Sequence, residues 1–123
     1  MYKNLLIVAA GGALGSIARF LIYVIFPKNN FPVNTLIINI AGSFVIGLLY
    51  AISLRQNNIS ETTLLFWATG ICGGFTTFST FSLENIQLLQ SGKVIPAVLY
   101  TIISITGGLL ACWLGYKLLQ IKL

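Results

Sequence analysis

The sequence contains no histidine, and its only acidic residues are Glu61 and Glu84. Enzymes most often use histidine or a carboxylate as a general acid or base, and such a group activates their nucleophiles. With so few of these side chains, the sequence offers no nucleophile placed beside a base. We therefore predict that the protein is not an enzyme.

Cysteine is scarce as well, since the chain has only Cys72 and Cys112. Both fall inside apolar segments, and without histidine they have no spacing typical of a metal site. We expect both to be small buried side chains.

Charge is the third scarcity: 7% of the 123 residues are charged, 57% are hydrophobic, and the mean hydropathy is +0.94. This balance is far more apolar than that of a soluble domain, so a lipid bilayer is the expected solvent. A net charge of +5 can indicate nucleic-acid binding, but most basic residues here flank apolar segments. Anchoring at the membrane surface explains them better, and we expect no nucleic-acid partner.

The apolar segments predict an all-α membrane protein with a single domain over residues 1–123. Crossing about 30 Å of hydrocarbon takes about 20 apolar residues, so four spans and short turns use nearly the whole chain. Hydropathy and charge place these spans at about Leu5–Phe26, Val33–Leu54, Thr62–Gln90 and Val94–Gln120.

The predicted connectors are short and polar, namely Pro27–Pro32, Arg55–Glu61 and Ser91–Lys93. Neighbouring helices should therefore be antiparallel, with both termini on one side of the membrane. The basic residues outside the spans divide weakly between the two sides: Lys3, Arg55, Lys117 and Lys122 on one, Lys28 and Lys93 on the other. Insertion in either direction is plausible, and a dimer of oppositely oriented subunits is possible.

Small residues recur at a spacing of four, which lets membrane helices approach closely. We interpret them as packing positions: Gly11 with Gly15, Gly12 with Ser16, Ser43 with Gly47, and Ala111 with Gly115.

The third span is unusual, because residues 70–82 place paired glycines and a run of hydroxyl residues inside an apolar segment. A continuous helix is poorly favoured there. A helix break in lipid frees backbone groups that cost several kcal/mol each unless protein, water or an ion satisfies them. We predict a helix interrupted in mid-membrane that lines a functional site. A glycine-kinked helix whose hydroxyls bond to their own carbonyls is the alternative.

The segment Gly73–Ser82, GGFTTFSTFS, resembles the signature of the small bacterial fluoride channels called Fluc or CrcB. The resemblance covers essentially the whole chain. Its other parts are Gly11–Ser16 with Arg19 in the first span, Asn34–Leu36, Asn39 and Gly42–Phe44 in the second, and Tyr100 with Ser104 in the fourth.

This resemblance implies an antiparallel, dual-topology homodimer with two pores and a structural sodium ion at its centre. Backbone carbonyls at the helix breaks of both subunits would hold the sodium, and here they belong to Gly73 and Thr76. Carbonyls released by a break are hard oxygen ligands, which suit a hard cation.

Fluoride holds water tightly, so a pore must replace that water with hydrogen-bond donors and avoid carboxylates. The phenyl edges carry partial positive charge and can also face an anion. The resemblance implies a pore lined by Asn39, Phe78, Phe81, Thr77, Thr80, Tyr100 and Ser104. Taken without it, the two phenylalanines would be packing residues, and Asn39 could equally bridge two helices.

Two charged residues are predicted near the vestibules. Arg19 lies within the first span, where it either snorkels to the surface or, as the resemblance suggests, lies near an aqueous vestibule and raises the local anion concentration or holds the fold. Glu84 lies one turn beyond Phe81, and its role stays open. The family's fourth span often has a second serine four positions after Ser104, where this chain has Gly108.

We therefore expect passive export of fluoride across the cytoplasmic (inner) membrane by a multi-pass channel. The main alternative is a proton-coupled, small dual-topology transporter, although such proteins typically need a glutamate in the first span, where this chain has Arg19. An inert assembly subunit would explain the glycines but not an interrupted third span.

Overall fold

The computed structural model describes residues 1–55 and 59–120, and all regular structure within them is helical. Four helical segments are long and apolar enough to cross a membrane: α1 (Tyr2–Ile25), α2 (Val33–Arg55), a composite segment (Glu61–Gln90) and α6 (Val94–Gln120). The predicted all-α class and the four spans are thus confirmed, with boundaries that differ by a few residues.

The composite third span has four parts, which are α3 (Glu61–Leu64), the π-helix η1 (Leu65–Cys72), α4 (Gly73–Phe75) and α5 (Phe78–Gln90). Ser60 caps its start, because its hydroxyl accepts a hydrogen bond of 3.1 Å from the amide of Thr63. The middle of the predicted second connector, residues 56–58, lies outside the described residues.

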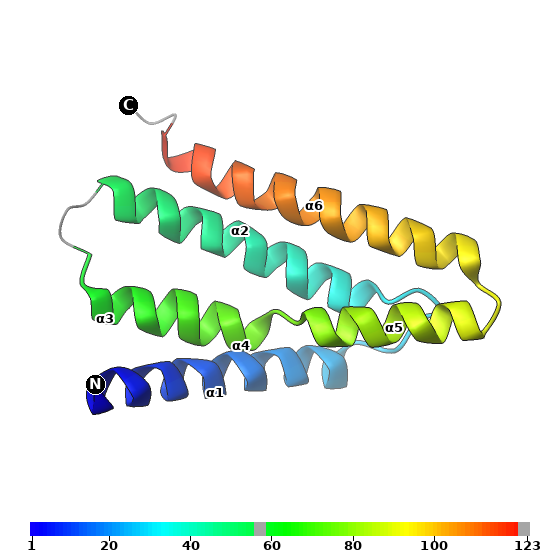
Figure 1. The fold of residues 1–123 in the computed structure, drawn as a ribbon, viewed down its shortest axis with the longest axis horizontal. Helices are drawn as coiled ribbons and strands as arrows, with labels where there is room; N and C mark the ends of the chain where they lie inside the picture. The colour runs from blue at the N-terminus through cyan, green and yellow to red at the C-terminus, as the bar shows by residue number, and fades with distance from the viewer. Residues whose placement is uncertain (56–58, 121–123) are drawn as a thin grey trace.

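Successive spans run in opposite directions, so α1 begins at the same end of the bundle at which α6 ends (Figure 1). Lys3, Arg55 and Lys117 belong to this end, whereas Lys28 and Lys93 lie in the connectors at the other. This is the predicted division of the basic residues, except that Lys122 lies outside the described residues. At the far end, Gly92 has a φ of 76°, which suits glycine and closes the turn between α5 and α6.

The helices pack in two close pairs, α2 along α6 and α1 along η1 and α4. A Cβ added to Gly47 would lie 2.0 Å from the carbonyl oxygen of Cys112, and one added to Gly15 would lie 2.2 Å from that of Ile71. The backbones therefore touch where the glycines lie, which confirms their packing role. Gly12 differs, because a Cβ there would meet nothing within 4 Å.

A small apolar core closes the end of the bundle where Lys28 and Lys93 lie, called here the connector end. Leu88, Ala97 and the fully buried Tyr100 form it, and Phe31 and Phe81 pack against it. Most other large apolar side chains are exposed on the single chain, as expected for surfaces that face lipid or another subunit.

Both cysteines are free, but only Cys72 is buried. The prediction of a buried side chain was wrong for Cys112, which is partly exposed. The reason is that α6 turns the Cys112 backbone toward Gly47 of α2.

Candidate functional site at a helix break

The third span changes course at Thr76 and Thr77, about midway along its length (Figure 1). Both residues are extended, with φ and ψ of −77° and 155° at Thr76 and of −152° and 114° at Thr77. The π-helix η1 lies one short helix before them, and such widened turns often occur at functional sites. This geometry fits the interruption predicted from the sequence.

Local hydroxyl groups account for the two helix ends at this point. The Thr76 hydroxyl donates to the Cys72 carbonyl at 2.8 Å, where the last turn before the break ends. The Thr77 hydroxyl accepts a hydrogen bond of 3.2 Å from the Thr80 amide and so caps α5. The hydroxyl-rich run thus supplies the cap of α5 and a second donor to the Cys72 carbonyl, which already accepts from the Thr76 amide.

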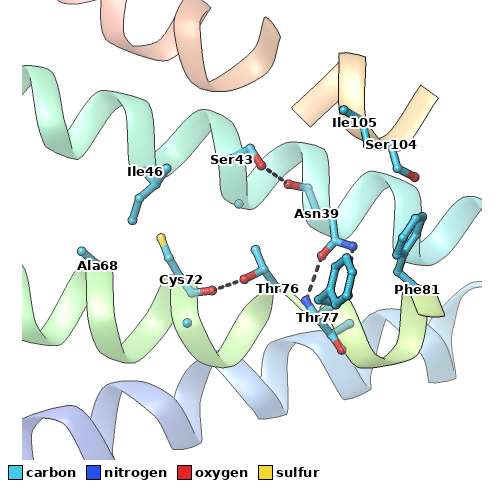
Figure 2. Close-up of a pocket in the computed structure, with 13 residues that line it drawn as sticks. Asn39, Ser43, Ile46, Ala68, Cys72, Thr76, Thr77, Phe81, Ser104 and Ile105 are labelled. Atoms are coloured by element: carbon cyan, nitrogen blue, oxygen red, sulfur yellow. Dashed lines mark hydrogen bonds between the residues drawn. The ribbon is translucent and has the colours of Figure 1, made fainter. Parts of the chain in front are cut away.

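Asn39 of α2 satisfies the extended residue between the helices at two points (Figure 2). Its Oδ1 accepts a hydrogen bond of 2.8 Å from the Thr77 amide, and its Nδ2 donates to the Thr77 carbonyl at 3.1 Å. The side-chain amide of asparagine has two N–H donors that could face an anion. The structure commits one of them to the backbone, which leaves one for a ligand.

These contacts also free two carbonyls from their usual helical donors. The fourth residue after Gly73 is Thr77, whose amide donates to Asn39, and the fourth after Thr76 is Thr80, whose amide donates to Thr77. Gly73 and Thr76 are therefore two of the positions at the break whose carbonyls lose the normal i+4 partner. Both are hard oxygen donors of the kind that a sodium ion binds.

A cavity of about 420 Å³ opens beside the break, between α2, the third span and α6 (Figure 2). None of the described residues that line it is charged. The polar groups in its wall come from Asn39, Ser43, Thr76, Thr77 and Ser104, and its aromatic groups come from Phe78 and Phe81. The Ser104 hydroxyl is buried and has no hydrogen-bond partner within residues 1–55 and 59–120. A buried hydroxyl is costly without a partner, so this one is suited to a molecule or ion in the cavity.

A second cavity of about 450 Å³ lies at the connector end, where Lys28 and Glu84 belong to its lining. Glu84 accepts hydrogen bonds from the Thr35 hydroxyl at 2.5 Å and from the Tyr100 hydroxyl at 3.5 Å. Since the Thr35 proton is directed to Glu84, the Tyr23 hydroxyl donates to Thr35 at 2.6 Å. Hydroxyl groups from three other helices thus converge on this carboxylate: Thr35 and Tyr100 donate to it directly, and Tyr23 acts through Thr35.

Comparison with known proteins shows which family this chain belongs to. A family model described as CrcB-like protein, Camphor Resistance (CrcB), matches residues 6–116 of the chain. The chain belongs to the CrcB family. It is 42% identical to a protein named Fluoride-specific ion channel FluC from Azobacteroides pseudotrichonymphae, and the match covers 98% of each chain.

Two further CrcB-family relatives carry the same printed name. One, from Flavobacterium psychrophilum, is 45% identical over 92% of this chain and 94% of its own. The other, from Leptospira interrogans, is 46% identical over 87% of each. These names describe ion channels, so the family is one of channels rather than enzymes, and this chain is a multi-pass membrane protein.

With the CrcB family shown, the predicted pore residues can be located in the fold. The cavity beside the break brings together Asn39, Thr77, Phe78, Phe81 and Ser104. The Phe78 and Phe81 rings lie 5.4 Å apart, and 78% of Phe78 is exposed on the single chain.

Two of the predicted pore residues take other positions. Thr80 lines the second cavity, although its hydroxyl also accepts a bond of 3.1 Å from the Thr77 hydroxyl. Tyr100 lies between the cavities, with its ring edge toward Phe81 at 5.1 Å and its hydroxyl on Glu84. A bond from Thr77 to Thr80 thus connects the wall of one cavity to the wall of the other.

Neither Gly47 nor Arg19 belongs to the lining of the cavity beside the break. Gly47 does not extend the polar face of Asn39 and Ser43, because it packs against the backbone of Cys112. Arg19 is partly exposed on α1 and makes no hydrogen bond or ion pair within the described part of the chain. Its choice between snorkelling and a vestibule role stays a prediction.

The sequence analysis assigned no role to Thr35 or Tyr23. Thr35 is 1% exposed, and both hydroxyls belong to the group that converges on Glu84. A signal for Thr35 was present, because it lies one helical turn before Asn39. Tyr23 had no comparable signal, since it comes from a different helix.

Proposed function

We propose that the chain is a fluoride channel that exports the ion passively across the inner, cytoplasmic membrane. The observation that carries the proposal is the cavity beside the helix break. Among its described residues it combines an amide, several hydroxyls and two phenyl rings with no carboxylate. The names of the CrcB relatives support the choice of fluoride as the ion.

The chemistry of this cavity suits a small, strongly hydrated anion. The free N–H of Asn39 and the unpartnered Ser104 hydroxyl can each donate to the ion. The rims of Phe78 and Phe81 carry partial positive charge and can face the ion when its water is removed. A carboxylate in the wall would repel the anion, and the described wall has none.

The proposed assembly is an antiparallel homodimer that lines its pores with both subunits. Support comes from Phe78, whose ring is 78% exposed on the single chain although it lies at the cavity. The polar groups of an open cavity cannot face lipid without cost, and a second copy placed over Phe78 would close the open side of the cavity.

A structural sodium ion belongs to the same proposal. The carbonyls of Gly73 and Thr76 are free of their helical donors, so they could hold this ion at the dimer centre. A bound cation would offset the cost of leaving these carbonyls in an apolar environment. We expect a higher melting temperature of the detergent-solubilised protein in sodium chloride than in potassium or N-methylglucamine chloride. Equal melting temperatures in all three salts would argue against the sodium site.

The direction of transport follows from chemistry and membrane voltage. Neutral HF enters cells from acidic surroundings and dissociates at the near-neutral pH of the cytoplasm, which traps fluoride. An interior-negative voltage drives an anion outward at about 2.3 kcal/mol per charge per 100 mV. A passive channel is therefore sufficient to lower the internal fluoride concentration.

One observation favours a second candidate, a small proton-coupled dual-topology transporter. Glu84 is a carboxylate within a membrane span that accepts two hydroxyl hydrogen bonds, and such a group can carry a proton. The two candidates differ in what drives fluoride movement.

Fluoride release from liposomes separates the two candidates. Vesicles loaded with potassium fluoride and containing the purified protein are diluted, and external fluoride is recorded with an ion-selective electrode. A channel needs a potassium ionophore such as valinomycin to relieve the voltage that builds up, and we expect rapid release only after its addition. Release that ignores the ionophore and follows an imposed proton gradient would favour the transporter. No release under either condition would contradict both candidates.

A further inference from the structure

We infer that Ser43 of α2 supplies a second hydroxyl to the permeating anion, at the point where α6 offers only Gly108. The inference rests on the proposed fluoride channel and extends it by one ion-contacting residue. It concerns a position that the sequence analysis did not include among the pore residues.

The Ser43 side chain lies at the contact between α2 and α6. A Cβ built on Gly108 would lie 3.5 Å from the Ser43 Oγ, so the two positions face each other across the α2–α6 contact. Ser43 and Ser104 both line the cavity beside the break, from α2 and α6 respectively (Figure 2). A hydroxyl from α2 therefore occupies the space that a side chain at position 108 would reach.

The Ser43 hydroxyl is available to bind an ion. It donates to the Asn39 carbonyl at 2.7 Å, four residues earlier on the same helix. That carbonyl also has the Ser43 amide as its normal helical donor, because α2 is continuous from Val33 to Arg55. The hydroxyl can therefore rotate toward an anion without leaving the Asn39 carbonyl unpaired. Its lone pairs can meanwhile accept a hydrogen bond from water that accompanies the ion.

Hydrogen-bond donors follow one another along the cavity. Asn39 keeps one free N–H, Ser43 lies one turn further along the same helix, and Ser104 has a buried hydroxyl without a partner in the described residues. An ion that moves from Asn39 toward Ser43 would thus keep a hydroxyl partner at the level where α6 offers only Gly108. A Cβ at position 108 would be in ordinary van der Waals contact with the Ser43 hydroxyl, so a serine there could place a hydroxyl beside it.

The competing interpretation is that Ser43 only bonds back to its own helix, as serines often do. Ser53 provides a matched control, because its hydroxyl donates to the Tyr50 carbonyl at 2.6 Å on the same helix. Ser53 does not belong to the lining of the cavity beside the break. A role in helix bonding alone predicts the same behaviour for Ser43→Ala and Ser53→Ala.

The experiment measures ionophore-dependent fluoride release from liposomes for wild type, Ser43→Ala, Ser53→Ala, Gly108→Ser and the double variant Ser43→Ala/Gly108→Ser. Losing one hydrogen bond to a charged ligand should slow release by Ser43→Ala about tenfold or more, while Ser53→Ala keeps the wild-type rate. The double variant should regain most of the lost rate, because its serine restores a hydroxyl from α6. Melting temperatures in detergent establish that each variant is folded, and Ser43→Gly serves as a second hydroxyl-free variant if Ser43→Ala is unstable.

Two results would overturn the inference: wild-type release by both hydroxyl-free variants, or a double variant that remains as slow as Ser43→Ala. The proposed function fails differently, since the wild-type protein would then show no ionophore-dependent release.

Discussion

The side-chain amide of Asn39 pairs with the backbone amide and the backbone carbonyl of Thr77, at 2.8 and 3.1 Å. One side chain from α2 thus replaces the bond that the Thr77 amide would make in an unbroken third helix, and it adds a donor to the Thr77 carbonyl, which as the N-cap of α5 also accepts from the first turn of that helix. The pairing lowers the cost of placing the extended segment in an apolar environment, because its backbone groups are hydrogen-bonded. The same pairing fixes α2 beside the break. It also ties a candidate ion ligand to the structural element that shapes the cavity.

The pairing predicts that Asn39→Ala destabilises the protein as well as blocking transport. The change leaves the buried Thr77 amide unpaired, at about 1–3 kcal/mol, and removes one of the donors to the Thr77 carbonyl. Asn39→Asp keeps the acceptor for the Thr77 amide but loses the donor and adds a negative charge. We expect a large drop in melting temperature for alanine, a smaller one for aspartate, and no fluoride release from either. Unchanged release by Asn39→Asp at neutral pH would place Asn39 off the ion path.

The phenylalanine pair leads to a prediction about transport without a change in folding. Phe78→Ile and Phe81→Ile roughly keep side-chain volume but remove the ring edge, so fluoride release should fall strongly while the protein stays folded. Phe26→Ile is the control, because Phe26 ends α1 and is exposed. Wild-type release by both pore variants would show that the two rings only pack.

The cap of α5 is tested by a matched pair at Thr77. Thr77→Val removes the hydroxyl that accepts from the Thr80 amide at 3.2 Å, and such a loss typically costs about 1 kcal/mol. Thr77→Ser keeps the hydroxyl. We expect a lower melting temperature in detergent for valine than for serine, with serine near wild type. Equal melting temperatures would mean that the cap contributes little to stability.

Glu84 should stabilise the protein mainly because its oxygens accept hydrogen bonds, and less because of its charge. Glu84→Ala leaves the Thr35 and Tyr100 hydroxyls without this partner, at about 1–3 kcal/mol for each group that stays unpaired. Glu84→Gln keeps an oxygen that can accept from one of them. Thermal unfolding should therefore rank wild type first, glutamine second and alanine last. A glutamine variant as unstable as alanine would show that the charge itself is needed.

Close helix packing is tested by two glycines with opposite surroundings. A Cβ on Gly47 would lie 2.0 Å from the Cys112 carbonyl oxygen, whereas one on Gly12 would meet nothing within 4 Å. Gly47→Ala should destabilise the protein by about 1–3 kcal/mol through overpacking, and Gly12→Ala should be tolerated. Equal stabilities of the two alanine variants, measured by thermal unfolding, would contradict the close contact of α2 with α6.

The position of the break was predictable because its causes are local. Paired glycines and the β-branched Thr76 and Thr77 disfavour a continuous helix, and the threonine hydroxyls supply nearby hydrogen-bond partners. The division of Asn39 between the backbone and a ligand was not predictable, since Thr77 is 38 positions away and the pairing depends on how α2 lies beside the third span. The same limit applies to Tyr100, whose hydroxyl direction depends on Glu84 of another helix.

Hydropathy, short connectors and the glycine-threonine run were enough to establish four helical spans, their antiparallel order and the place where the third changes course. These are properties of chain segments in an apolar solvent, where length and backbone satisfaction leave few choices. Only the packed helices decided which hydroxyls face a cavity and which end on Glu84, and that Ser43 lies opposite Gly108. Such contacts join residues of different helices, and their geometry depends on how closely glycine backbones let those helices approach.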